Sequence, residues 1–325
     1  MKRILAISTL ALSSIAFGQQ SFQSSQYTQN MYLLNPAAAG LSNNIDVNLG
    51  HRSQWTNFDN APSTYYLSAN ALLGKPANHE NIFSLRISDP KLTVDNNVSS
   101  TGSESKVKHA VGGIFYRDEA GAFSRTSGAA SYTIHIPVGK KSSLAAGVRL
   151  GVNNTAFDQT LAGVRDQNDQ VFNDFANGNS SVNKLDGSIG LMYYTPKFYL
   201  GYAIDQIFGN TLDFSEDAEA QLVSHHLINA GLRLQLNENI GVTPSTLVRM
   251  TAGAPVSFDI NAKVDYKNNF FVGVGVRPGD AIIIQAGLKV TDNIKFGYSY
   301  DLTTSDVNSV SSGTHEIVLG IALSK

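Results

Sequence analysis

The sequence predicts an all-β fold, an antiparallel transmembrane β-barrel of about 14 strands in the outer membrane. Three observations predict it: apolar and polar residues alternate along many short segments, the N-terminus resembles an export signal, and the connections alternate in length. The alternation is plain in residues 228–236, 258–266 and 294–301, where almost every second residue is apolar. Because successive side chains of a strand point to opposite faces, each such segment has one apolar and one polar face.

Alternation alone fits two kinds of protein. A soluble sandwich turns its apolar faces inward and its polar faces to solvent. A membrane barrel turns its apolar face to lipid and its polar or small residues to the lumen. The export signal and the connection lengths favour the barrel.

The composition excludes several classes of function. Charged residues make up 15% of the 325 residues and the formal net charge is -2, so nothing indicates a nucleic-acid partner. Cysteine is absent, which excludes disulfides, thiolate metal sites and a cysteine nucleophile. The chain carries 28 Gly, 13 Tyr and 16 Phe, a profile that favours strands and tight turns.

The N-terminus has the three parts of a secretory signal peptide. Lys2 and Arg3 precede an apolar stretch over residues 4–17, and the small residues Ala16 and Gly18 stand before the expected cleavage site. No other segment reaches the roughly 20 apolar residues that a spanning helix needs. If the mature protein lies in a membrane, it therefore crosses it with strands.

These signals divide the chain into three parts. We expect cleavage between Gly18 and Gln19, which makes residues 1–18 a signal peptide and residues 19–44 an N-terminal periplasmic leader. Residues 45–325 form the barrel, and a polar stretch within them, residues 74–107, is an insertion.

The connections between the predicted strands supply the third observation. We expect strands at residues 45–52, 63–71, 108–117, 125–136, 142–152, 184–194, 197–205, 223–236, 245–251, 256–266, 269–276, 280–290, 293–301 and 313–323. The connections on one side are short, at residues 137–141, 195–196, 267–268 and 291–292. Several on the other side are long, at residues 153–183, 206–222 and 302–312. Short periplasmic turns and long surface loops distinguish outer-membrane barrels. Residues 72–107 and 277–279 do not follow the rule.

The same register predicts what faces the lumen. Its charges are of mixed sign: Asp46, Arg52, Arg149, Asp186, Arg233, Asp259, Lys263, Asp265, Lys289 and Lys295. Offsetting charges suit a packed or plugged interior, or a small polar pore, and both interpretations stay open.

No pattern indicates catalysis, a cofactor or a metal. His225 and His226 are adjacent, so in a strand they point to opposite faces and cannot act on one group. No recognised hydrolase or nucleotide-binding motif occurs. Acidic residues gather at residues 213–219 and 166–174 without calcium-loop spacing, so we expect solvated loops there. We therefore expect a protein that is not an enzyme.

An ordered set of short motifs runs along the mature chain. A polar and aromatic leader contains Asn35-Pro36, strand one ends near Arg52-Ser53-Gln54-Trp55, and strand two begins at Ala61-Pro62-Ser63-Thr64. Tyr300-Asp301 and His315-Glu316 follow at the last two strands. In this order the motifs resemble those of the PorP/SprF family of type IX secretion system membrane proteins. The insertion at residues 74–107 departs from the family pattern.

The resemblance implies an outer-membrane component of the type IX secretion and gliding machinery. It implies that the barrel assists secretion or surface attachment of adhesin-type cargo, through the cargo's C-terminal sorting domain. Other implied partners are outer-membrane lipid, further secretion components and, for some members, a periplasmic peptidoglycan-binding protein. A passive porin is the alternative function, and a barrel enzyme is the third.

Each motif also has a physical interpretation. Asn35 and Pro36 turn the chain into strand one. Trp55 is an amphipathic anchor at the membrane interface. Further residues tie down the first surface loop or order the last hairpin: Arg52, Gln54, Pro62, Thr64, Tyr300, Asp301, His315 and Glu316. The plainer alternative for all of them is barrel architecture rather than partner contact.

Overall fold

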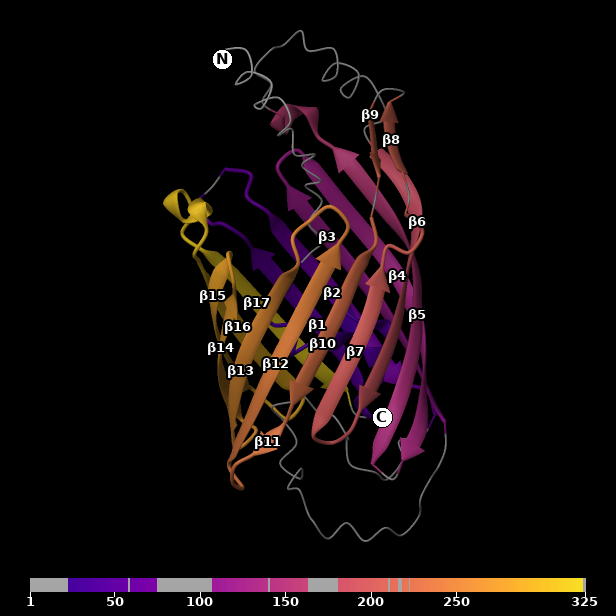
Figure 1. The fold of residues 1–325 in the computed structure, drawn as a ribbon, viewed down its shortest axis with the longest axis vertical. Helices are drawn as coiled ribbons and strands as arrows, with labels where there is room; N and C mark the ends of the chain where they lie inside the picture. Colours follow the sequence, from indigo (N-terminus) through magenta and orange to yellow (C-terminus); the bar gives the residue numbers. More distant parts are fainter. Residues whose placement is uncertain are drawn as a thin grey trace, which may run out of the picture.

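In the computed structural model the chain forms a closed antiparallel barrel of 14 strands (Figure 1). The structure describes residues 23–57, 59–74, 107–139, 141–162, 181–209, 211–215, 218–221 and 223–323. The wall consists of β1 (Ile45–Ser53), β2 (Ser63–Leu72), β3 (Lys108–Ala120), β4 (Phe123–Gly139), β5 (Ser142–Phe157), β6 (Ser181–Tyr194), β7 (Phe198–Asp205), β10 (His225–Leu232), β12 (Ile240–Thr251), β13 (Ser257–Tyr266), β14 (Phe270–Arg277), β15 (Ala281–Lys289), β16 (Ile294–Thr303) and β17 (Thr314–Leu323).

Neighbouring strands in the sequence are neighbours in the wall, and two further pairings complete the ring. β1 pairs with β17, which joins the two ends of the barrel along a seam. β10 pairs with both β7 and β12. The short β11 (Leu234–Gln235) continues along β12, while β8 (Thr211–Ser215) and β9 (Ala218–Gln221) form a separate hairpin. No described helix is long and apolar enough to cross a membrane.

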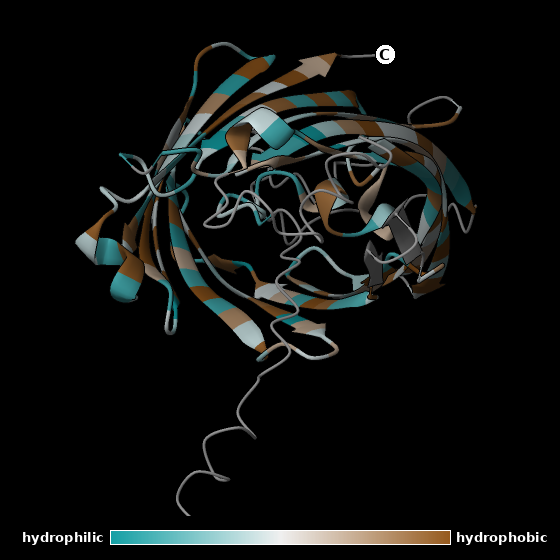
Figure 2. Ribbon diagram, turned by 90° about the horizontal axis from the view of Figure 1, so that it is seen from above, coloured by the Kyte–Doolittle hydropathy of each residue, from teal (hydrophilic) through white to brown (hydrophobic). Residues whose placement is uncertain are grey.

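The two faces of each strand differ as the alternation predicts. On β13, Asp259, Lys263 and Asp265 are buried inside the barrel. Ile260 and Val264, on the alternate positions, point outward and are 57% and 38% exposed. The strands in Figure 2 are banded in two colours for this reason. Apolar residues outside and polar residues inside are the arrangement of a wall that stands in lipid.

The two ends of the barrel differ in their connections. β1 begins and β17 ends at one end, which we name the turn end. Residues 195–197, 267–269 and 290–293 connect strands there. Lys267 and Asn268 both have positive φ, 49° and 52°, which is the two-residue hairpin geometry that matches strand twist. The opposite end, which we name the loop end, is where β5 and β6, β7 and β10, and β16 and β17 are connected.

Several predicted boundaries were wrong. β3 and β4 continue to a tight turn at residues 121–122, and β5 and β6 run past the predicted ends at residues 152 and 184. Polar pairs such as Asn154 with Asn183 (2.9 Å) extend the ladder beyond the apolar band. The predicted strand at 223–236 is shorter as β10, and β12 begins earlier than predicted. The signal peptide and nearly all of the insertion at 74–107 lie outside the described residues.

The described part of the leader lies inside the barrel. Residues 23–44 contain two short 3-10 helices, η1 (Met31–Leu33) and η2 (Pro36–Ala38), and Tyr27, Ala37 and Ala39 are 0% exposed. We expected residues 19–44 to lie in the periplasm, and for residues 23–44 the structure contradicts this. The physical reason is that the polar inner wall supplies hydrogen-bond partners and small-residue space that match this segment. The strand pattern carries no information about what fills the lumen.

Candidate functional site

A buried ionic cluster lies at the seam, towards the loop end. Arg52 on β1 donates from Nη2 to Asp301 Oδ2 on β16 (2.9 Å) and from Nη1 to Glu316 Oε2 on β17 (3.2 Å). Arg52 and Glu316 stand directly opposite each other in the register of the closing strands. All three side chains are almost fully buried. The first strand and the last two are therefore joined by charge as well as by their backbone ladder.

A second group of charges continues this cluster around the wall. Arg277 donates from Nε to Asp259 Oδ1 (2.8 Å), and Arg249 donates from Nη1 to the same oxygen (3.1 Å). Arg277 Nη1 also lies 3.7 Å from Asp301 Oδ2, which links the two groups. We name the whole set the ionic clamp: Arg52, Arg249, Asp259, Arg277, Asp301 and Glu316. Its three guanidinium and three carboxylate groups balance in charge, as buried ions must if they are to stay charged.

The leader enters the ionic clamp with its first described residues. Ser25 Oγ donates to Asp301 Oδ2 (2.6 Å), and the Ser25 amide donates to Glu316 Oε2 (2.7 Å). Ser24 Oγ donates to the other oxygen of Glu316. The leader then runs along the lumen to the turn end, where β1 begins. The clamp thus holds the seam and the start of the leader together.

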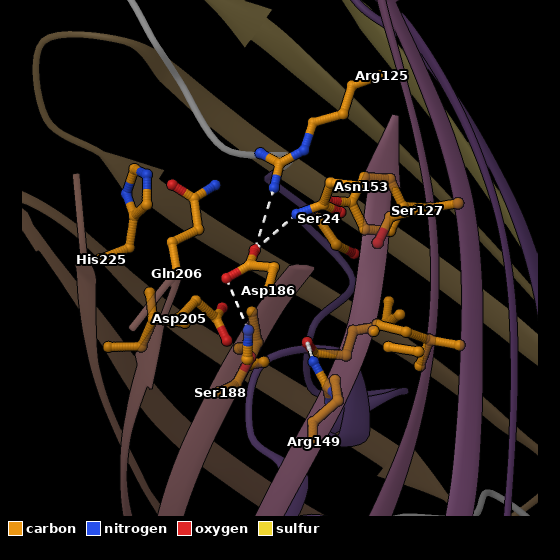
Figure 3. Close-up of a pocket in the computed structure, with 18 of the residues that line it drawn as sticks. Ser24, Arg125, Ser127, Arg149, Asn153, Asp186, Ser188, Asp205, Gln206 and His225 are labelled. Carbon is orange, nitrogen blue, oxygen red and sulfur yellow. Dashed lines mark hydrogen bonds and ion pairs between the residues drawn. The ribbon is translucent and has the colours of Figure 1, made fainter. Parts of the chain in front are cut away.

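A cavity of about 100 Å³ lies beside the leader, against the wall opposite the seam. Figure 3 shows four of the charged residues that line it, on four neighbouring strands: Arg125, Arg149, Asp186 and Asp205. Arg249 of the ionic clamp also borders the cavity. Asp186 Oδ2 accepts from Asn153 (2.6 Å) and, at 3.5 Å, from Arg125. Leu33 and Leu34 of the leader form part of its lining. The leader forms one side of this cavity and the wall strands form the other.

The structure brings some of the predicted site residues together. Arg52, Asp301 and Glu316, predicted separately at the first loop and the last hairpin, form the core of the ionic clamp. Asn35 caps η2 by accepting from the Ala37 amide (2.8 Å), and it donates to the Leu191 carbonyl (3.1 Å). Pro36 follows it at the first position of η2.

Other predicted residues lie around the seam but outside the clamp. The Gln54 amide donates to the Pro62 carbonyl (2.8 Å), and the Trp55 amide donates to Thr314 Oγ1 (3.2 Å). Thr64 Oγ1 donates to Asp118 Oδ1 at 2.5 Å. These contacts order the first loop of the barrel.

The predicted histidine and tyrosine residues of the last hairpin point away from the lumen. His315 Nδ1 lies 2.7 Å from Tyr298 Oη, and Tyr300 Oη donates to the Ser312 carbonyl (2.8 Å). The adjacent His225 and His226 face opposite sides, as alternation predicts. His225 contacts Thr251 inside the barrel and His226 contacts Tyr202 outside it.

Sequence reasoning missed part of the ionic clamp. Arg249 lies two residues before the end of β12 and Arg277 ends β14; both point inward, yet neither was among the predicted lumen-facing charges. The inward parity of the predicted strand at 245–251 would have found Arg249, and extending the predicted strand at 269–276 by one residue would have found Arg277. Ser24 and Ser25 carry no signal that separates them from the many other serines of the chain.

No group of described residues could hold a metal ion. The acidic stretch at residues 166–174 lies outside the described part of the chain, and the side chains at 213–219 are not described. The observed contacts are hydrogen bonds and ion pairs that bind one part of the chain to another.

The chain matches one known protein family over nearly its whole length. That family, type IX secretion system membrane protein PorP/SprF, matches residues 16–321. The chain belongs to the PorP/SprF family. The motifs that indicated this family therefore lie in the leader, at the clamp and at the seam of one barrel. No curated protein sequence matches the chain.

Three solved structures resemble the chain at TM-scores below 0.5. Omp33 of Acinetobacter baumannii has a TM-score of 0.47 and 8% identity over 87% of this chain and 100% of its own. A FadL homologue of Pseudomonas aeruginosa has a TM-score of 0.45 and 11% identity over 94% of each chain. The toluene transporter TodX of Pseudomonas putida has a TM-score of 0.45 and 10% identity over 94% and 95%. At such identities none of their activities is carried over to this chain.

Proposed function

We propose that this PorP/SprF protein is a non-enzymatic accessory barrel that assists secretion or surface attachment of adhesin-type cargo. Membership of the family supports a membrane component of the type IX secretion system. The role in adhesin handling, the cargo's C-terminal sorting domain and a periplasmic peptidoglycan-binding partner belong to the proposal.

The filled lumen is the observation that carries this proposal. Leader residues such as Tyr27 and Ala37 are fully buried, and the remaining cavity is small. A passive porin needs an aqueous path through its lumen. A barrel whose lumen is occupied by its own chain is better suited to binding proteins at its two ends.

The loop end offers a surface for a secreted partner. Outer-membrane barrels keep short turns on the periplasmic side, so we place the loop end at the cell exterior. The first loop (residues 54–62) and the last loop (residues 304–313), here called the seam loops, bind each other there. The Thr56 amide donates to the Gly313 carbonyl (2.9 Å) and the Ser312 amide donates to the Thr56 carbonyl (2.8 Å). Val310 is 55% exposed on this pair.

The test is crosslinking and capture of the tagged barrel from gently solubilised outer membrane. We expect a secreted adhesin and type IX components among the captured proteins. Val310→Asp should reduce capture of the adhesin by placing a charge on the seam loops. Leu161→Asp is the matched control, because Leu161 is 47% exposed at another place on the loop end.

Two results would contradict the proposal. One is normal surface adhesin in cells that lack the gene, with no protein partner captured. The other is solute flux through the unmodified barrel in liposomes, which is the prediction of the porin alternative.

A further inference from the structure

The barrel wall binds the leader largely through the leader's main chain. Arg149 donates to the carbonyls of Tyr32 and Leu33, and Thr133 Oγ1 donates to the Pro36 carbonyl (2.7 Å). Further main-chain contacts follow the leader along the lumen: Gln285 to the Ser25 carbonyl, Lys295 to the Gln29 carbonyl, His135 to the Ala39 carbonyl, and the Gly40 amide to Asn70. Side chains that bind peptide groups in this way recognise a path of backbone.

Glycines in the wall make room for this path. A Cβ on Gly147 of β5 would lie 2.6 Å from the Ala37 nitrogen. Gly190 of β6 leaves room for the side chain of Asn35, and Gly297 of β16 leaves room for that of Gln26. Close approach of a second backbone is one of the reasons for glycine inside a strand. The inner surface is therefore shaped for a polypeptide.

Two aromatic side chains of the leader occupy slots in the wall. Tyr27 Oη accepts from Asn261 Nδ2 (3.0 Å) and contacts Ser245 Oγ (3.3 Å). Tyr32 Oη lies 2.7 Å from Ser131 Oγ on β4, and its ring stacks under the Arg149 guanidinium. Each of the three buried apolar clusters contains leader residues packed against wall residues. Among the described residues, the apolar core of the protein is the contact between leader and wall.

The geometry points to a peptide-binding site that fills the lumen and holds the chain's own leader as its occupant. The ligand class is a polypeptide segment that carries two tyrosines followed by an Asn-Pro turn. The leader is covalently joined to β1, and such tethering raises its effective concentration to about millimolar or more, so it keeps the site closed. A separate polypeptide with the same features binds when the leader is absent. This inference concerns the lumen and does not depend on the proposed role in adhesin export.

The test uses the complete barrel and a shortened chain that lacks residues 23–40, each in a planar lipid bilayer. We expect the complete barrel to be closed to ions and the shortened barrel to conduct in steady steps. A synthetic peptide of residues 23–44, added at about millimolar concentration, should abolish that conductance. A scrambled peptide of the same composition should leave it, because its tyrosines and its turn no longer match the slots.

Three results would overturn the inference. They are steady conductance of the complete barrel, a folded but non-conducting shortened barrel, and a conducting shortened barrel that the peptide fails to close. Heat-modifiable gel mobility reports whether each barrel has folded.

A full-length variant keeps the test valid if the shortened chain does not fold. Gly147→Leu should expel the leader and open the barrel, because the new side chain would overlap the backbone at Pro36 and Ala37. Gly113→Leu on β3 is the matched control, since the nearest atom to its Cβ is 3.6 Å away. Equal conductance of these two variants would contradict a leader-shaped lumen.

Discussion

The ionic clamp and the charges of the cavity have similar composition and different surroundings. Arg52 and Glu316 of the clamp are 1% and 0% exposed. Arg125 and Asp186 of the cavity have side chains that are 20% and 15% exposed, and their one ion-pair contact is 3.5 Å long. Ser24 and Ser25 of the leader bind Glu316 and Asp301 of the clamp, and the carbonyls of Tyr32 and Leu33 accept from Arg149 of the cavity. The leader contacts both charge networks, so they differ in burial and in the length of their ion pairs rather than in contact with the leader.

The largest expected effect is on the clamp. Arg52→Ala leaves the carboxylates of Asp301 and Glu316 buried without their main partner. Breaking a buried pair in this way costs about 3–5 kcal/mol. The loss in free energy of unfolding is measured by denaturant unfolding of the purified barrel in detergent. Arg117→Ala is the control, because its pair with Glu119 is about half exposed and is worth at most ~1 kcal/mol. Equal losses for the two variants would contradict the special position of the clamp.

A smaller effect is expected at the cavity. Asp186→Asn keeps the size of the side chain and removes the charge that faces Arg125 and Asn153. Hydrogen bonds to a charged group contribute about 1.5–3 kcal/mol, and partial exposure to solvent places those of Asp186 at the lower end. The same unfolding measurement should show a loss well below that of Arg52→Ala. A loss of the same size would mean that the cavity charges are as tightly coupled as the clamp.

Solvent access should also separate the two regions. The chain has no cysteine, so a single introduced thiol can be labelled without background. Ser188→Cys lines the cavity, and Ser299→Cys lies at a fully buried position on the inner face of β16. We expect Ser188→Cys to react faster with a small thiol reagent by roughly tenfold or more, because buried sites react only through opening. Equal labelling rates at the two positions would show that the leader does not keep the reagent out of the part of the lumen next to the seam.

The smallest expected effect concerns a carboxylate outside both regions. Asp158 follows β5 at the loop end, and the Thr160 hydroxyl and then the Thr160 amide lower the pKa of its carboxyl group. A pKa that is lower in the folded state stabilises the fold at neutral pH, and this contribution is lost as pH falls through that pKa. The carboxyl chemical shift should titrate below the ordinary aspartate range. Thr160→Val should move the midpoint back towards it, and an unchanged midpoint would contradict the assigned cause.

The strands could be predicted because each side chain has to suit the medium that it faces. That medium is lipid outside the barrel and the polar lumen inside it. The alternation in residues 258–266 divides β13 into a polar and an apolar face, and the barrel prediction makes the polar face the inner one. The predicted register also placed Arg52 on the inner wall, whereas Glu316 was predicted only to order the last hairpin. Their direct contact was not predictable, because it depends on the pairing of the first strand with the last.

The leader shows the opposite case. Its residues do not alternate and do not form strands, so the sequence placed it outside the barrel. Its position depends on partners spread along the chain, from Arg52 to Glu316. No local pattern in residues 23–44 specifies such partners.

The sequence by itself determined the membrane-facing surface, the strand number and the family, since these depend on local periodicity and on ordered motifs. Tertiary structure alone decided that the lumen is filled, where the clamp closes the seam and which side of the lumen stays hollow. The physical reason is that lipid and water act on each strand separately. The interior is instead determined by hydrogen bonds, charges and close packing between residues that the closed ring brings together.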